Sequence, residues 1–473
     1  MRRTKIIATL GPASDSTKVI KQLVNAGLDV ARLNMSHGDH ATQKKRIDAI
    51  RSVDPNMAIL IDLQGPKIRT GVLKGGIATL HSGGEFIITT KKILGNEKIV
   101  STTYTKLSKD VKPGDCILID DGLIKLKVIK VRKDEVHCKV VNGGVLKDHK
   151  GLNLPGVKIS ESSFTAKDRK DLYFAIKERV DYVALSFVRY PEDVIKLKKI
   201  LKNAGAAIPV IAKIEKPEAL KNLDEIIKVS DGIMVARGDL GVEMLPEKVP
   251  VIQKDIINRC NFYAKLVITA TQMLETMVVN PRPTRAEASD VANAVYDGTD
   301  ALMLSEEVAV GKYPVQSVKT MVNIIKEVEK VLYTKHHEVS LRTVNKTIAS
   351  AVSHAACHTA EELNANAIIT FTSSGSTALL VSKFKTDVPV YAVTNNERTM
   401  RKVRLYFGVT PVFTKRSKST DEMILAAERC LLKAGFVRKG DLVVLVAGIP
   451  TGISGTTNLI KVHKIGEAAI LSR

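Results

Sequence analysis

The chain has 473 residues, of which 72 are Lys or Arg and 50 are Asp or Glu, so its formal net charge is +22. Hydrophobic residues make up 44% and charged residues 26%, which is typical of a globular protein and excludes a disordered chain. No apolar stretch reaches the length of a membrane span, and the N-terminal apolar run is too short for a signal peptide. The five cysteines are scattered without a C-x-x-C pair, which excludes a disulfide scaffold or zinc finger and favours a cytoplasmic location.

Short apolar runs separated by helical patterns recur through the first two thirds of the chain. Continuous apolar runs are typical of parallel strands covered on both faces. The predicted strands are Thr4–Thr9, Asp29–Leu33, Ala58–Asp62, Tyr182–Phe187, Pro209–Ile214, Gly232–Val235, Val267–Thr271 and Ala301–Leu304. The clearest helices between them are Ser16–Ala26, Pro191–Ala204 and Lys248–Ala264. Such βα units predict a TIM (β/α)8 barrel, with its chemistry at the C-terminal ends of the strands.

The barrel pattern is interrupted once and then followed by a further domain. Residues 70–165 carry short alternating strands and Gly-rich turns, which predict a small all-β domain inserted over the active face as a lid. Its strands are expected at Glu85–Thr89, Cys116–Ile119, Leu123–Val131 and Val136–Val141. The barrel then comprises residues 1–69 and 166–340. Residues 341–473 predict an open α/β domain, with strands at Ala367–Phe371, Val388–Val393, Val409–Phe413 and Leu442–Val446.

Two neighbouring strands end in opposite charges. Lys213 and Glu215 are two residues apart and therefore point to one side of their strand. The next strand is followed by Gly238, Asp239 and Gly241. The two carboxylates can share a hard cation such as Mg²⁺, and the glycines let backbone N–H groups approach an anion. A plain Lys–Glu ion pair beside an ordinary glycine turn explains the same residues equally well.

Other strand ends are also polar. Arg32, Asn34 and Ser36 alternate onto one face and suit phosphate oxygens. Lys67 and Arg69 follow the third strand, where a solvated basic loop is the alternative. Thr271 at the seventh strand is by itself better explained as a core residue of high β-propensity.

Together these groups comprise two carboxylates, several fixed cations and glycine turns at one barrel face. Phosphoryl transfer needs such a set, because it depends on positioning and charge neutralisation. No G-x-x-x-x-G-K-[ST] loop is present.

Six motifs of the chain resemble the pyruvate kinase family, in family order over essentially the whole length. They are residues 32–38 (RLNMSHG), 62–71 (DLQGPKIRTG), 213–215 (KIE), 230–241 (SDGIMVARGDLG), 270–275 (ATQMLE) and 280–287 (NPRPTRAE). The resemblance implies transfer of a phosphoryl group from phosphoenolpyruvate to ADP, giving pyruvate and ATP. It also implies the barrel, lid and regulatory C-terminal domain, and a homotetramer.

The resemblance assigns roles residue by residue. Arg32 and Lys213 would hold the phosphoryl group, and Lys213 would stabilise the enolate oxygen. Glu215 and Asp239 would bind Mg²⁺ or Mn²⁺, the Gly238 and Asp239 amides would receive the substrate carboxylate, and Thr271 would help protonate the enolate. The groups implied to meet the nucleotide phosphates are Asn34, Arg69 and Lys150. Those implied around a monovalent cation are Asn34, Ser36, Asp62 and the Leu63 carbonyl.

The chain departs from the family at the monovalent-cation region. Members that require K⁺ have Thr, Lys and Glu where this chain has Leu63, Gln64 and Lys67. The Lys67 ammonium can supply fixed positive charge in place of the ion, so we expect activity without K⁺.

The C-terminal domain carries a hydroxyl-rich loop between a strand and a helix. Free N–H groups and hydroxyls at such a position can bind an anion, although a simple capped helix start is the alternative. The resemblance implies an effector site for a sugar phosphate or a nucleotide, with residues 452–457 as the facing loop. The residues of the loop are Thr372, Ser373, Ser374, Gly375, Ser376 and Thr377.

Two other classes of function compete with this interpretation. A metal-dependent lyase on a pyruvate-enolate barrel would share the carboxylate pair, but Lys150 of the lid favours a nucleotide. A nucleic-acid-binding protein would explain the charge, yet aromatic residues make up only 4% of the chain and Trp is absent. We expect neither nucleic acid nor a membrane as a partner.

Overall fold

Eight parallel strands form a closed barrel in the computed structural model, which describes residues 2–334, 344–416, 419–449 and 456–467. Around the barrel the order is β1-β16-β15-β14-β13-β12-β3-β2. The strands are β1 (Lys5–Thr9), β2 (Val30–Asn34), β3 (Ala58–Asp62), β12 (Tyr182–Leu185), β13 (Val210–Ile214), β14 (Gly232–Ala236), β15 (Leu266–Ala270) and β16 (Ala301–Leu304). All eight predicted strands are present, and the predicted fold class is confirmed.

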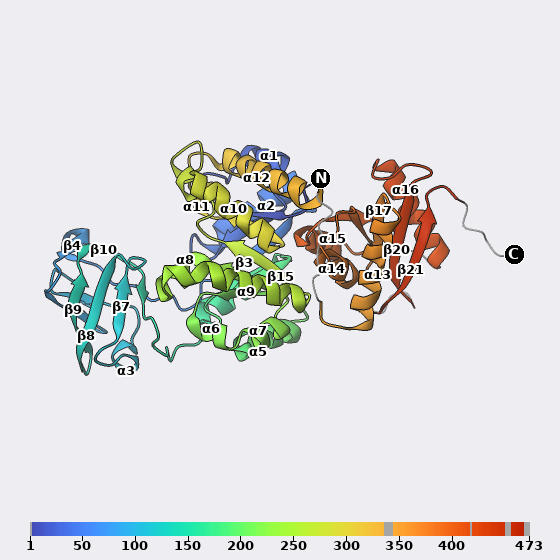
Figure 1. Cartoon of the computed structure of the whole chain (residues 1–473). Helices are drawn as coiled ribbons and strands as arrows, with labels where there is room; N and C mark the ends of the chain where they lie inside the picture. The colour runs from blue at the N-terminus through green and yellow to red at the C-terminus, as the bar shows by residue number, and fades with distance from the viewer. Residues whose placement is uncertain (1, 335–343, 417–418, 450–455, 468–473) are drawn as a thin grey trace.

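Helices pack around the outside of the barrel (Figure 1). They are α1 (Thr17–Ala26), α2 (His40–Val53), α4 (Ala166–Lys177), α5 (Pro191–Asn203), α6 (Pro217–Lys221), α7 (Leu223–Val229), α8 (Arg237–Glu243), α9 (Val249–Phe262), α10 (Arg285–Asp297), α11 (Glu306–Ala309) and α12 (Pro314–Thr334). Residues with capping preferences mark the ends of these helices. For example, the Ser16 side chain caps the N-terminus of α1, and Gly27, with a φ of +114°, follows its last residue. Within the described residues, no helix is both long and apolar enough to cross a bilayer.

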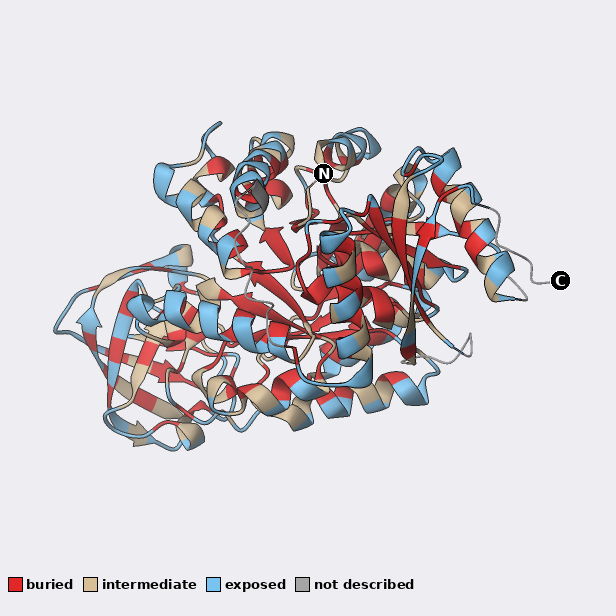
Figure 2. Ribbon diagram, turned by 45° about the vertical axis from the view of Figure 1, so that its right-hand side comes forward, coloured by how far each residue is buried: buried red, intermediate tan, exposed pale blue. Residues whose placement is uncertain are grey.

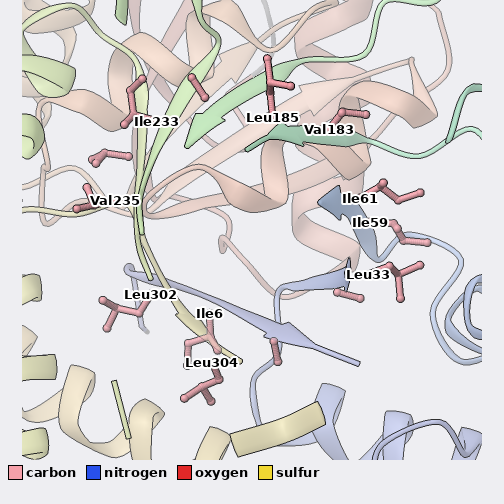
Figure 3. Packing of buried hydrophobic residues seen from close by; sticks show 14 of the residues in the cluster. Ile6, Leu33, Ile59, Ile61, Val183, Leu185, Ile233, Val235, Leu302 and Leu304 are labelled. Atoms are coloured by element: carbon pink, nitrogen blue, oxygen red, sulfur yellow. The ribbon is translucent and has the colours of Figure 1, made fainter. Parts of the chain in front are cut away.

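Strand residues alternate between two apolar layers. Ile6, Leu33 and Ile61 belong to the cluster between the strands and the surrounding helices (Figure 3). Figure 2 shows the same division, with buried strands inside and exposed residues on the outer faces of the helices. Because successive side chains of a strand point to opposite faces, Arg32 and Asp62 face the barrel interior.

The inserted domain has its own apolar core, centred on residues such as Phe86 and Leu126. It lies at the side of the barrel opposite the C-terminal domain (Figure 1). Its strands are β4 (Ile77–Leu80), β5 (Glu85–Thr89), β6 (Ile99–Ser101), β7 (Cys116–Ile119), β8 (Ile124–Arg132), β9 (Glu135–Asn142), β10 (Gly144–Lys147) and β11 (Leu152–Asn153), with the short helix α3 (Leu107–Asp110). The sequence predicted β5, β7, β8 and β9, whereas β4, β6, β10 and β11 were missed.

The C-terminal domain is an open sheet in the order β19-β18-β17-β20-β21. Its strands are β17 (Ala367–Phe371), β18 (Val390–Thr394), β19 (Val409–Phe413), β20 (Leu442–Gly448) and β21 (Thr457–Lys464), and its helices are α13 (Ile348–Glu362), α14 (Ser376–Lys383), α15 (Glu397–Lys402) and α16 (Thr420–Lys433). The antiparallel strand β21 was not predicted. One apolar cluster joins the barrel interior, including Leu60 and Met234, to Ala356 and Val381 of this domain. The N-terminal end of the barrel is therefore covered, which leaves chemistry to the opposite end.

A buried charge cluster joins the barrel to the C-terminal domain. The Asp300 carboxylate, just before β16, pairs with both Lys383 and Lys385, and all three side chains are buried. Burial alone would raise the pKa of Asp300, but the two ammonium groups outweigh burial and hold this pKa below its usual range. The ionised carboxylate therefore stabilises the fold.

Replacing Asp300 by Asn is expected to lower the free energy of unfolding by about 3–5 kcal/mol at pH 7, because two buried ammonium groups lose their counter-ion. Since the folded pKa is lowered, this stabilisation is complete above the unfolded pKa of about 3.9 and is lost as the pH falls through the folded pKa. Urea unfolding of the wild type and of Asp300→Asn is measured between pH 3 and 7. The difference between their free energies of unfolding should become smaller only at the acid end of this range. The exposed Asp48→Asn, which removes one of two carboxylate partners of Lys44, should leave the urea midpoint almost unchanged. A pH-independent difference between wild type and Asp300→Asn would contradict this account.

Candidate active site

The inner ends of β2 and β3 bring a guanidinium and a carboxylate together. Arg32 Nε and Nη2 lie 2.9 and 2.7 Å from Asp62 Oδ2, and Nη1 donates to Thr9 Oγ1 at 2.7 Å. Both charged side chains are buried. Burial would raise the pKa of Asp62, but Lys213 and Arg32 together hold this pKa below its usual range. Asp62 therefore stays ionised and fixes the orientation of Arg32.

Lys213 lies at the centre of the inner charge cluster. Its Nζ is 2.8 Å from Glu215 Oε1, 3.3 Å from Asp62 Oδ1 and 2.9 Å from Ser186 Oγ. Burial would lower the pKa of Lys213, but Asp62 and Glu215 outweigh burial and raise it. The other carboxylate oxygen of Glu215 accepts the Phe187 backbone N–H at 2.8 Å. Lys213 is thus a positively charged donor with three polar partners at the mouth of the barrel.

Helix α8 follows β14 directly and places Gly238 against Thr271. The Gly238 N–H donates to Thr271 Oγ1 at 2.8 Å, and this hydroxyl donates to the Ala270 carbonyl at 2.5 Å. Thr271 has a φ of +71°, a strained backbone conformation for a β-branched residue. Arg237 supports the turn, since its Nη2 donates to the Thr271 carbonyl at 2.7 Å and its Nη1 pairs with Asp290 at 2.7 Å.

Two carboxylates lie at the C-terminal ends of β13 and β14: Glu215 directly follows β13, and Asp239 lies in the first turn of α8. Burial raises the pKa of Glu215, and the negative charge of Asp239 raises it further against the opposing effect of Lys213. The two negative charges therefore repel each other. Among the described residues, no group of three or more His, Cys, Asp or Glu side chains could hold a metal ion. Two carboxylates do fit Mg²⁺, which commonly takes one or two protein carboxylates together with water and substrate oxygens.

The predicted monovalent-cation region lies beside Arg32. Asn34 Oδ1 accepts the Ser36 backbone N–H at 3.0 Å, and the Leu63 carbonyl accepts the Ser186 hydroxyl at 2.7 Å. Ser36 is half-buried and Lys67 is exposed. Burial lowers the pKa of the nearby His37, and the positive charge of Lys67 lowers it further. Lys67 therefore adds positive potential to this region.

Arg69 and Lys150 lie on the two chain segments that connect the barrel to the lid. Arg69 forms a β-bridge with Gly151, and its Nη1 donates to the His149 carbonyl at 2.8 Å. Lys150 Nζ is 2.8 Å from Asp120 Oδ1, a residue of the lid. The fold thus brings Arg69 and Lys150 side by side, although they are 81 positions apart in the chain.

The hydroxyl-rich loop of the C-terminal domain lies between β17 and α14. Gly375 has a φ of +91°, and its N–H donates to Thr372 Oγ1 at 2.9 Å. Thr377 Oγ1 lies 2.8 Å from Thr457 Oγ1 of β21, while Ser374 and Ser376 contact each other through their hydroxyls at 3.2 Å. Ser373 is exposed. The predicted facing loop lies outside the described residues for positions 452–455.

Two family models match almost the entire chain. The model for the pyruvate kinase barrel domain matches residues 1–318, and the model for the pyruvate kinase alpha/beta domain matches residues 350–463. The chain belongs to the pyruvate kinase family. Two similar relatives are the pyruvate kinases of Staphylococcus aureus strains MRSA252 and USA300. Each is 49% identical over 99% of this chain and 81% of its own length.

A solved structure agrees with this membership. The crystal structure of a pyruvate kinase from Cryptosporidium parvum superposes with a TM-score of 0.90 at 37% identity, covering 98% of this chain and 96% of that one. The protein is a phosphotransferase that interconverts phosphoenolpyruvate and ADP with pyruvate and ATP. Membership of the pyruvate kinase family also implies a requirement for a divalent metal ion.

Four residues of the site were missed by sequence reasoning, namely Thr9, Ser186, Phe187 and Arg237. Ser186 and Phe187 end a predicted strand, so the same rule that selected Lys213 could have selected Ser186. Arg237 was visible inside a pyruvate kinase motif, but its role as a support for Thr271 depends on contacts across two strands.

Proposed function

We propose that Arg32 and Lys213 bind the phosphoryl group of phosphoenolpyruvate, and that Lys213 also stabilises charge on the enolate oxygen as the phosphoryl group leaves. The buried cluster of Lys213, Glu215, Asp62 and Ser186 carries this proposal, because it holds an ammonium group in a fixed place before substrate binds. A preorganised charge needs little reorganisation as the transition state forms.

Glu215 and Asp239 are the proposed ligands of the divalent ion, Mg²⁺ or Mn²⁺. Their two carboxylates provide hard oxygen ligands beside the phosphoryl site. When bound, such an ion neutralises negative charge on phosphoryl and enolate oxygens. Lys213 lies 2.8 Å from Glu215 and balances part of the carboxylate charge.

Gly238, Asp239 and Thr271 are proposed to position the three-carbon part of the substrate. The Gly238 and Asp239 N–H groups at the start of α8 would receive the substrate carboxylate, with the Thr271 hydroxyl turning away from the Gly238 N–H as the substrate enters. Thr271 would then help to deliver a proton to the enolate carbon. Its strained backbone supports this role, since such strain is concentrated at functional sites.

ADP and ATP are proposed to bind through Asn34, Arg69 and Lys150. The position of the last two residues at the lid connection supports this, because lid closure would move both cations together toward a nucleotide phosphate. Lys150 would exchange its partner Asp120 for the phosphate.

The test is pyruvate release from phosphoenolpyruvate, with and without ADP and Mg²⁺. We expect release only when both are present. Release that requires Mg²⁺ but not ADP would indicate hydrolysis of the phosphate ester and would contradict transfer to ADP. A metal-dependent lyase would release no pyruvate from phosphoenolpyruvate under either condition. Failure to release pyruvate, together with salt-sensitive RNA binding that survives Lys213→Ala, would favour a nucleic-acid-binding protein.

The site is also proposed to work without K⁺, because Lys67 supplies positive charge there. We expect kcat of the wild type to differ by less than about twofold between K⁺-free and K⁺-containing buffers, since the charge is built in. Lys67→Glu should lose at least about tenfold in kcat without K⁺ and regain part of it when K⁺ is added.

The matched control is Lys67→Gln, which removes the charge without adding a carboxylate that could hold an ion. It should lose activity and show little response to K⁺. A wild-type enzyme that needs K⁺ at saturating substrate, or a Lys67→Glu variant without any K⁺ response, would show that Lys67 does not replace the ion.

Regulation and assembly are also proposed. The hydroxyls and N–H groups between Thr372 and Thr377 suit the phosphate of a sugar-phosphate or nucleotide effector. A homotetramer remains a prediction from the resemblance, and a cytoplasmic location remains a prediction from the scattered cysteines. Sedimentation of the purified enzyme tests the homotetramer.

A further inference from the structure

A buried ion pair at the open end of the barrel takes no part in the chemistry proposed above. Lys216 Nζ lies 2.5 Å from Glu243 Oε1, and both side chains are buried. Lys216 follows the end of β13 by two residues, and its Nζ lies over the Phe187 ring, 5.7 Å from the centroid. Burying two charges is costly unless their polar atoms find further partners. For Glu243, one such partner comes from outside the barrel.

The same carboxylate oxygen of Glu243 accepts a hydrogen bond from the lid. Asn153 Nδ2 donates to Glu243 Oε1 at 2.9 Å. Asn153 ends β11, which pairs with β7 in the six-stranded sheet of the lid, with Asn153 opposite Leu118. One oxygen of Glu243 therefore joins an ammonium group of the barrel to an amide group of the lid. We call Asn153, Lys216 and Glu243 the lid latch.

The lid latch lies between two groups of residues that the reaction is proposed to use. On the barrel side, Glu243 ends α8, the helix that carries Asp239 in its first turn and lies on the side of the barrel facing the lid (Figure 1). On the lid side, Asn153 lies three residues after Lys150, on the segment that forms a β-bridge with Arg69. The lid latch thus ties the segment with the proposed nucleotide-binding cations to the helix with the proposed metal ligand.

We propose that the three residues of the lid latch are positioning residues for the nucleotide, because they hold the lid connection where Lys150 and Arg69 reach the nucleotide phosphates. This inference rests on the proposed role of Lys150 and Arg69 in nucleotide binding. When the latch is broken, the lid takes other positions and only a fraction of the molecules can bind ADP. The apparent dissociation constant for ADP then rises by the inverse of that fraction, whereas bound ADP restores the competent position. The latch therefore acts on KM for ADP more than on kcat.

The test is steady-state pyruvate formation by the full-length enzyme, with ADP and phosphoenolpyruvate varied separately. Asn153→Asp replaces the amide donor by a second carboxylate, which repels Glu243. We expect KM for ADP to rise at least about tenfold, with KM for phosphoenolpyruvate and kcat within about threefold of the wild-type values. Asn153→Ala, which only removes the donor, should shift KM for ADP in the same direction by a smaller factor.

A second variant distinguishes positioning from a general loss of stability. Asn153→Asp/Glu243→Gln exchanges the amide and the carboxylate, so a donor again faces an acceptor and Lys216 again has a carboxylate partner. This double variant should bring KM for ADP back to within about threefold of the wild-type value. The matched control is Asn142→Asp, which adds the same charge to an exposed residue of β9 in the lid and should leave KM for ADP unchanged.

Lys150→Ala tests the nucleotide role separately, since it leaves the lid latch intact. It should raise KM for ADP, and a wild-type value would contradict the nucleotide role of Lys150 and the latch proposal with it. The latch proposal alone is overturned if Lys150→Ala raises KM for ADP but Asn153→Asp does not. It is also overturned if Asn153→Asp raises KM for both substrates equally, or if the double variant is no better than Asn153→Asp.

Discussion

Replacing Lys213 by Met is expected to lower kcat for pyruvate formation by at least about 10³-fold, because a preorganised charge next to the transferred group acts mainly on the transition state. Met retains most of the side-chain volume, so the loss reports the missing charge and not a cavity. The measurement is steady-state pyruvate release at saturating phosphoenolpyruvate, ADP and Mg²⁺. Circular dichroism at the assay temperature verifies that the variant is folded.

Stability is the main confounding effect, because Lys213→Met leaves Asp62 and Glu215 without their shared counter-ion. Lys383→Met is the matched control, since Lys383 is also buried and pairs with Asp300 far from the open end of the barrel. The Lys383→Met variant should be less stable than the wild type, yet its folded form should keep kcat within about tenfold of the wild-type value. If the two variants lose activity equally, the charge of Lys213 has no special role in transfer.

The architecture followed from sequence where segments are buried on both faces. The central strands read as continuous apolar runs, and β3 and β16 were predicted with their observed bounds. The missed strands lie outside the barrel, in the inserted domain and at the edge of the C-terminal sheet. Strand β21 pairs only with β20 at the edge of its sheet, and half of its residues are exposed, so its pattern is polar. Edge strands are held by hydrogen bonds to a neighbour, and those bonds leave little trace in sequence.

The site was predictable as a set of residue types but not as a set of contacts. The period of two placed Arg32 on one face with Asn34, yet the bonds of Arg32 to Asp62 and Thr9 depend on which strands become neighbours in the closed barrel. Thr271 is a further example, since a β-branched residue normally avoids its positive φ. Here the hydrogen bond from Arg237 and the tight turn into α8 hold Thr271 at a positive φ against its preference for a negative one. The residues next to Thr271 in the sequence do not reveal these contacts.

Replacing Glu215 by Gln is expected to weaken Mn²⁺ binding about 100-fold and to lower kcat about 10²-fold or more, because one of two proposed carboxylate ligands loses its charge. Gln retains the shape of the side chain and an oxygen that can still accept the Phe187 N–H. Mn²⁺ affinity is measured by electron paramagnetic resonance of the free ion, which needs no turnover. Higher Mg²⁺ should restore part of the activity, since a ligand role changes the apparent metal affinity and a structural role does not.

Glu243→Gln provides the matched control. Glu243 is buried like Glu215, pairs with Lys216 and accepts Asn153 Nδ2 of the lid region at 2.9 Å. Its substitution removes a buried charge near the same end of the barrel, so it should cost stability without changing Mn²⁺ affinity. Equal losses of Mn²⁺ affinity in both variants would mean that local charge and not coordination governs the ion. Unchanged affinity in a folded Glu215→Gln enzyme would exclude Glu215 as a ligand and leave it as the counter-ion that orients Lys213.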